Sequence, residues 1–131
     1  MPGASPELYQ EFCMNKKEQY QKGLTGESEA EKYLASLGMT CLETRFRAED
    51  GEIDLIMLDR GVIVFVEVKY RPGSPAGAGL LAVTHNKQRR MTRAAAAYLA
   101  QREEMDTPAR FDVVEITKAG ILHVPNAFQP G

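Results

Sequence analysis

The stretch that decides the fold is Gly51–Lys69, which reads GEIDLIMLD-RG-VIVFVEVK. Two segments rich in Val, Ile and Leu lie on either side of Arg60-Gly61, a pattern typical of a β-hairpin with a tight turn. Most of the charged side chains lie at the end of the hairpin remote from that turn. We therefore predict strands over residues 52–59 and 62–70.

The length of the turn sets which side chains face each other across this hairpin. A two-residue turn places Asp54 directly opposite Glu67. In the same register, Glu52 lies opposite Lys69. The competing register has a bulge at Gly61 and sets the two carboxylates on opposite faces of a largely buried sheet, where unpaired charge is costly. We favour the two-residue turn because it collects the charge at one end of one face.

Two carboxylates that face each other across a strand pair repel, and a divalent cation relieves that repulsion. Asp54 and Glu67 suit Mg²⁺, which prefers a few carboxylate oxygens and keeps several waters, with Mn²⁺ as a second choice. Lys69 shares a face with Glu67, where it can orient a metal-bound water or stabilise charge on a phosphate. The alternative is structural: an ion pair between Glu52 and Lys69, with Asp54 solvated at a sheet edge.

Upstream of the hairpin, apolar residues follow helical spacing twice. Residues 6–21 predict a short amphipathic helix inside an N-terminal extension, residues 1–22. The pattern restarts at Gly26 and ends at a C-capping glycine, and residues 40–47 then predict a strand. Glu27 lies in the first turn of the second helix, where the helix dipole alone favours a carboxylate. It is also where a helix packed on the sheet would bring a further acidic group to the metal site.

Downstream of the hairpin, residues 71–83 are rich in Gly, Pro and Ala and predict a mobile loop. Residues 86–102 predict a helix, and residues 110–117 and 121–124 predict two further strands. This order of elements indicates an α/β fold with a mixed central sheet. We expect residues 23–131 to form a single domain.

Positive charge is concentrated in the helix predicted over residues 86–102. Between Thr84 and Arg102 there are five basic residues and no acidic one, although the whole chain has a net charge of −2. Such a face contacts nucleic-acid phosphates or is simply solvated. The candidate nucleic-acid-binding residues are Arg47, Arg71, Lys87, Gln88, Arg89, Arg90 and Arg93.

Length and composition exclude several classes of protein. The 131 residues are 44% hydrophobic and 26% charged, as in an ordinary globular domain. The longest uncharged apolar run is far shorter than the roughly 20 residues that span a bilayer. Two cysteines without CxxC spacing fit a reducing cytoplasm and argue against a disulfide scaffold or a zinc ribbon. We expect a cytoplasmic protein without membrane contact.

Several strings resemble the YraN family, a bacterial group of small proteins. They are GExxAxxYL from Gly26, GEIDLI from Gly51 and VFVEVK from Val64, followed by VTxxK from Val83 and RFDVV from Arg110. The strings occur in the order of the family, and the resemblance runs from about residue 23 to residue 128. It therefore covers most of the chain.

The YraN family resembles the restriction-endonuclease-like PD-(D/E)xK nucleases, particularly archaeal Holliday-junction resolvases. The resemblance implies a core of order αβββαβ, here with an extra N-terminal helix. It also implies four catalytic residues, of which the three acids would hold Mg²⁺ or Mn²⁺: Glu27, Asp54, Glu67 and Lys69. Two positions depart from the pattern, because Ile53 precedes Asp54 where the superfamily has proline and Arg45 stands where family members often carry Asn.

The expectation is a metal-dependent endonuclease that hydrolyses phosphodiester bonds, in DNA rather than RNA, at junctions or other branched structures. Two cleavages in one junction need two sites, which favours a homodimer. The alternative is a non-catalytic module that binds nucleic acid or a partner on the same fold. A structural role in a larger repair or uptake assembly is a third option, and only the N-terminal helix supports it.

Overall fold

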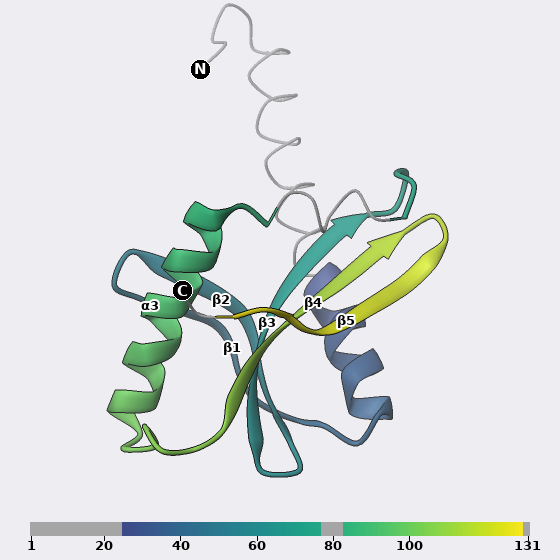
Figure 1. The fold of residues 1–131 in the computed structure, drawn as a ribbon. Helices are drawn as coiled ribbons and strands as arrows, with labels where there is room; N and C mark the ends of the chain where they lie inside the picture. The colour runs from purple at the N-terminus through teal and green to yellow at the C-terminus, as the bar shows by residue number, and fades with distance from the viewer. Residues whose placement is uncertain (1–24, 77–82, 130–131) are drawn as a thin grey trace, which may run out of the picture.

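The computed structural model describes residues 25–76 and 83–129 (Figure 1). The predicted extension over residues 1–22, with its helix, lies outside the described residues, as do residues 77–82 of the predicted loop. A helix covers residues 25–36, and α3 is His85–Gln101. The strands are β1 Thr40–Ala48, β2 Gly51–Asp59, β3 Val62–Arg71, β4 Ala109–Thr117 and β5 Gly120–Phe128.

The five strands form one mixed sheet in the order β1-β2-β3-β4-β5. β3 and β4 are parallel, and every other neighbouring pair is antiparallel. Parallel strands need a crossover connection, which α3 provides. The mixed α/β sheet predicted from the sequence is confirmed. β5 runs four residues beyond its predicted end at residue 124 and includes Pro125, which an edge strand tolerates.

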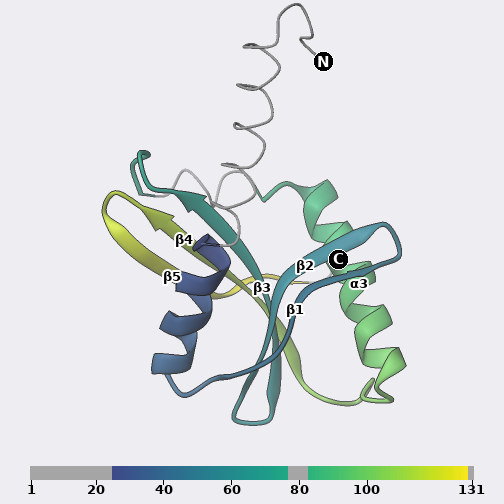
Figure 2. The same ribbon diagram turned by 180° about the vertical axis from the view of Figure 1, so that it is seen from behind.

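Two helices cover opposite faces of the sheet, as the two views show (Figures 1 and 2). The α3 face of the core contains Ile56, Phe65, Met91, Ala94, Tyr98 and Phe111. The opposite face contains Ala30, Leu34, Leu55, Val64, Val66 and Val114, of which the first two belong to the 25–36 helix. This three-layer arrangement is compatible with a restriction-endonuclease-like core. In the described part of the chain, no helix is long and apolar enough to cross a membrane.

The β2–β3 hairpin has the predicted two-residue turn. Arg60 and Gly61 both have positive φ, 49° and 84°, as a type I′ turn requires. The resulting register pairs Asp59 with Val62 and extends to Leu55 with Val66, which excludes the bulged alternative. Beyond these pairs the strands are joined differently, because a side chain of β2 accepts a hydrogen bond from the backbone of β3. That side chain is Asp54, the first residue of the site described below.

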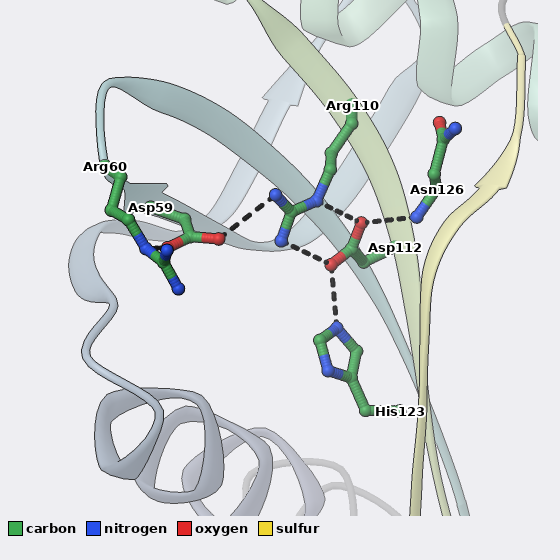
Figure 3. Close-up of polar contacts among 6 residues, drawn as sticks. All are labelled: Asp59, Arg60, Arg110, Asp112, His123 and Asn126. Carbon is green, nitrogen blue, oxygen red and sulfur yellow. Dashed lines mark hydrogen bonds and ion pairs between the residues drawn. The ribbon is translucent and has the colours of Figure 1, made fainter.

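A buried polar cluster ties β4 to β5 (Figure 3). The fully buried carboxylate of Asp112 accepts hydrogen bonds from Arg110 Nε at 2.9 Å and from the backbone N–H of Asn126 at 2.9 Å, and it contacts His123 Nε2 at 2.7 Å. Burial alone would raise the pKa of Asp112, but these hydrogen bonds outweigh it and lower the pKa. Arg110 also contacts Asp59 at 3.1 Å, so the cluster links three strands and has a structural role.

Candidate active site

The candidate active site lies at the end of the β2–β3 hairpin remote from its turn. Asp54 lies near the start of β2, and Glu67 and Lys69 lie near the end of β3. The antiparallel ladder of the hairpin, which ends at Leu55–Val66, brings these two stretches together. The direct Asp54–Glu67 and Glu52–Lys69 pairs predicted from the sequence are not part of that ladder, because the alternation of β2 is interrupted at Asp54. Glu27 approaches from the 25–36 helix, and Lys87 approaches from the first turn of α3. The site therefore depends on the pairing of β2 with β3 and on the packing of the 25–36 helix and of α3 against the sheet.

Glu67 is the centre of the site. Its side chain is 4% exposed, and its Oε2 contacts Nζ of Lys69 at 3.1 Å and Nζ of Lys87 at 3.5 Å. Oε1 of Glu67 is buried and makes no hydrogen bond of regular geometry to the residues that the structure describes. When Asp54 is protonated, its carboxyl can share a hydrogen bond with Glu67. Glu67 thus presents a buried oxygen that needs either a proton or a cation beside it.

Burial and the neighbouring charge of Glu67 raise the pKa of Asp54 from 3.8 to about 8. The backbone N–H of Val68 donates to Asp54 Oδ2 at 2.8 Å, which favours the ionised form but does not offset burial. Burial also raises the pKa of Glu27, against an opposing effect of Arg45. Like-charged carboxyls that keep a proton near neutral pH are typical of functional sites, although ion-pair networks produce them too.

The regular alternation of β2 is interrupted at Asp54. Ile53 and Ile56 both pack in the α3 cluster, whereas Leu55 packs in the opposite cluster. In a regular strand, residues three positions apart point to opposite faces. On the neighbouring strand, Arg45 has a left-handed backbone with φ 54°. The sheet is therefore irregular on both strands where it forms the site.

The structural alternative considered for the hairpin, an ion pair between Glu52 and Lys69, is wrong. Glu52 accepts a hydrogen bond from Arg47 Nε at 2.7 Å. Lys69 contacts Glu67 instead. The reason is that Arg47 lies directly across from Glu52 in the β1–β2 register, a pairing that the β2–β3 hairpin alone does not reveal. Lys69 therefore pairs with the buried carboxylate of Glu67 on its own strand.

The predicted nucleic-acid-binding residues do not all reach the site. Arg47, Lys87 and Arg90 line an open groove of about 540 Å³ between the β1–β2 turn and α3, next to Glu67. Arg93 contacts Asp50 in that turn at 3.0 Å. Gln88 donates to the carbonyl of Val83 at 3.1 Å, Arg89 contacts Asn86 at 3.5 Å, and Arg71 is exposed at the end of β3.

Sequence reasoning missed two residues beside the site. The Nε of Arg45 lies 3.4 Å from Oε1 of Glu27. Glu115 of β4 is fully buried and pairs with Lys69 in the β3–β4 register. The alternation of β4 could have placed Glu115 on the face of Lys69, but only if the register across the α3 crossover were already known.

The residues fit a divalent cation in part. Asp54 and Glu67 offer hard carboxylate oxygens, which Mg²⁺ and Mn²⁺ accept, and one of them is buried without a donor. However, within residues 25–76 and 83–129 no group of three or more His, Cys, Asp or Glu is arranged to hold a metal ion. The structure brings Asp54 and Glu67 together, and Glu27 lies beside them in contact with Arg45.

Comparison with known proteins gives a single family. Residues 26–116 match the family described as "Uncharacterised protein family UPF0102". A UPF0102 protein of Geobacter metallireducens is 46% identical over 111 residues, which cover 82% of this chain and 91% of that protein. A UPF0102 protein of Lachnoclostridium phytofermentans is 45% identical over 116 residues, 88% of this chain and 96% of that protein. One from Colwellia psychrerythraea is 41% identical over 113 residues, with 82% and 88% covered.

Proposed function

The chain belongs to the UPF0102 family, which is the YraN family, and on this premise we propose that it is a metal-dependent endonuclease acting on DNA in the cytoplasm. One observation carries the proposal: a buried carboxylate, Glu67, faces a second carboxyl, Asp54, and contacts two lysine ammonium groups. Paired carboxylates can hold a divalent cation that activates water and a phosphate, and a neighbouring lysine can add a positive charge to that site. Branched DNA is the proposed substrate, and a homodimer would supply one site for each of two cuts.

Asp54 and Glu67 would hold the cation, and Glu27 would add a third carboxylate from the 25–36 helix. A bound Mg²⁺ would supply Lewis-acid stabilisation of the phosphate and lower the pKa of a water. Asp54 has to lose its proton to take part, because its pKa in the protein is about 8. Lys69 would orient the attacking water or stabilise charge on the phosphate, and its contact with Glu67 Oε2 at 3.1 Å supports this role.

The groove beside the site would guide the DNA backbone. Arg47, Lys87 and Arg90 line it and offer cationic groups to successive phosphates. Three acidic residues, Glu49, Asp50 and Glu52, line it too, and Glu52 accepts a hydrogen bond from Arg47, so a phosphate must compete with these carboxylates for the cationic groups. Binding through these residues should weaken steeply with salt, as phosphate contacts do.

A specific observation favours the alternative, a non-catalytic module that binds nucleic acid or a partner. Lys69 and Lys87 together neutralise Glu67 without any metal. The described part of the chain also contains no group of three acidic or His/Cys ligands arranged around a common point. A module of this kind would keep the groove with its three basic residues and bind nucleic acid in the presence of a chelator.

The test is a titration with Mg²⁺ and Mn²⁺ on labelled four-way junction, flap, duplex and single-stranded DNA, with matched RNA. The wild type is compared with Lys69→Ala and with Lys118→Ala, which removes an exposed lysine from the β4–β5 turn. We expect cleavage that needs the metal and Lys69 and does not need Lys118. Salt-sensitive binding without cleavage of any substrate would overturn the nuclease and support the module.

A further inference from the structure

The β1–β2 turn carries two acidic side chains beside α3 (Figures 1 and 2). They belong to Glu49 and Asp50, which both have the left-handed backbone of a two-residue hairpin turn, with φ of 53° and 59°. Uncharged Gly and Asn suit this conformation at least as well. The shape of the turn therefore does not explain why two exposed carboxylates stand here.

Acidic residues of this region are paired with arginines. Nη2 of Arg93 lies 3.0 Å from Oδ1 and 3.3 Å from Oδ2 of Asp50. Two positions further along the chain, Glu52 accepts a hydrogen bond from Arg47 at 2.7 Å. Three acidic and three basic residues line the groove beside the site, so its lining has no net charge. A phosphate that enters the groove must therefore compete with carboxylates that the chain itself supplies.

The Asp50–Arg93 pair is not what holds the turn in place. The β1–β2 ladder continues to the Ala48–Gly51 pair, directly before and after the turn. Gly51 packs so closely on α3 that a Cβ there would collide with the backbone carbonyl of Arg90. The side chains of Arg93 and Asp50 are 50% and 71% exposed, and an ion pair of such exposure contributes little to stability. Another anion can therefore replace Asp50 on Arg93 without unfolding the turn.

Arg93 continues the cationic lining of the groove along α3. Arg90 lines the groove, and Arg93 follows it by three positions, so the two side chains are neighbours on the surface of the helix. Asp50 lines the same groove and contacts Arg93. A nucleic-acid strand that passes Arg90 would therefore reach Arg93 next, and it would meet Asp50 there.

We propose that Arg93 is a phosphate-binding position that extends the groove along α3, and that Asp50 occupies it in the free protein. Carboxylate and phosphate compete for the same guanidinium, so Asp50 lowers the affinity of this surface for nucleic acid. This inference rests on the proposed function, because the phosphates are those of the nucleic acid that the groove would guide. It needs neither a metal ion nor cleavage.

The test measures the binding of labelled duplex and four-way-junction DNA in EDTA, by fluorescence anisotropy. Asp50→Asn removes the charge and keeps a side chain that suits the left-handed backbone. We expect it to bind DNA about two- to fivefold more tightly than the wild type, the range set by an exposed ion pair. Glu49→Gln makes the same change of charge at the neighbouring turn position, away from the contact with Arg93, and should have a smaller effect. Asp106→Asn, beyond the C-terminal end of α3, should leave the affinity unchanged.

A double-mutant cycle with Arg93→Gln decides whether Asp50 acts through Arg93. In the Arg93→Gln background, Asp50→Asn should raise DNA affinity no more than Glu49→Gln does. Arg93→Gln should weaken binding more in the Asp50→Asn protein than in the wild type, because Asp50 no longer occupies the arginine. A gain from Asp50→Asn that persists in full without Arg93, or that does not exceed the gain from Glu49→Gln, overturns the proposal. The urea midpoint of Asp50→Asn should match that of the wild type, and a clear decrease would also overturn it, because the pair would then hold the turn.

Binding in EDTA separates this inference from the proposed nuclease. Tighter binding by Asp50→Asn, together with no cleavage by the wild type in Mg²⁺ or Mn²⁺, would support the phosphate position at Arg93 and refute the nuclease. Cleavage by the wild type, together with equal binding by Asp50→Asn and the wild type, would refute the phosphate position alone. If neither protein binds DNA, both the phosphate position and the groove's part in the proposed function are refuted.

Discussion

The replacement Asp54→Asn should stabilise the metal-free protein while it removes the proposed activity. Asn has the shape of Asp and keeps an oxygen to accept the hydrogen bond from the Val68 backbone N–H. It cannot carry the negative charge that burial and Glu67 disfavour, so the destabilising interaction is lost and the fold is kept. The same charge is the one that a cation would need.

The magnitude follows from the pKa of Asp54. Its folded value of about 8 lies above its ordinary value of 3.8, and each unit is worth about 1.4 kcal/mol. Between these two values the folded protein keeps a proton that the unfolded chain has released, so stability falls as pH rises across that window. Asp54→Asn can therefore raise the free energy of unfolding by at most about 4 kcal/mol at pH 7. We expect an increase of about 1–3 kcal/mol, because solvent screens a half-buried group.

The assay is urea unfolding in EDTA at a series of pH values from about 4 to about 9. Tyrosine fluorescence reports unfolding, because the chain has five tyrosines and no tryptophan. The difference between Asp54→Asn and wild type should be near zero at the acid end and should grow until the pH passes the pKa of about 8. Asp106→Asn, which removes an exposed carboxylate, should show no such growth. A difference that does not change with pH, or an Asn variant that is less stable at the alkaline end, would refute the reasoning.

Three further replacements test the packing and the polar cluster, each by urea unfolding. Asp112→Ala should lower the free energy of unfolding by about 3–5 kcal/mol, because it leaves the buried partners of that carboxylate without their acceptor. A loss below about 1 kcal/mol would mean that water replaces the carboxylate as the acceptor. Gly51→Ala should lower the free energy of unfolding by about 1–3 kcal/mol, because a Cβ there would collide with the backbone carbonyl of Arg90 in α3, which cannot rotate away. An unchanged urea midpoint would show that α3 shifts freely. Tyr98→Phe should change stability by less than about 1 kcal/mol, because the buried hydroxyl makes no hydrogen bond of regular geometry and has only a weak interaction with the nearby Arg102 guanidinium. A larger loss would show that Arg102 bonds the hydroxyl.

The local parts of the fold and site could be predicted from the sequence. The alternation of residues 55–66 and the Arg60-Gly61 turn were sufficient to set the hairpin register as far as Leu55–Val66. Asp54 lies close to Glu67 as a consequence, but not as the predicted direct pair, because β2 loses its alternation at Asp54. The sheet-facing side of α3 was sufficient to direct Lys87 toward Glu67. These are short-range consequences of periodicity, and no knowledge of distant contacts was needed.

The remaining features depend on contacts between distant segments. The β3–β4 register sets Lys69 beside Glu115, and it follows from how α3 packs on the sheet. The positive φ of Arg45 could not be predicted, because the position is not occupied by glycine or asparagine, the residues that usually indicate this conformation. Likewise, Arg47 donates a hydrogen bond to Glu52 only because the β1–β2 register sets these two residues opposite each other. Hydrophobic pattern and turn chemistry do not carry this information.

The energetic cost of Asp54 bears on the choice between the two proposed functions. A module that only binds nucleic acid would use the groove beside the site and would not need Asp54, whose ionisation burial and Glu67 disfavour at a cost in stability. A group that costs stability in the metal-free protein is expected where the activity needs it. A cation between Asp54 and Glu67 would remove this destabilisation, because it would replace the proton on Asp54 and supply a partner for Oε1 of Glu67. The proposed nuclease therefore predicts that a bound cation lowers the pKa of Asp54 well below about 8.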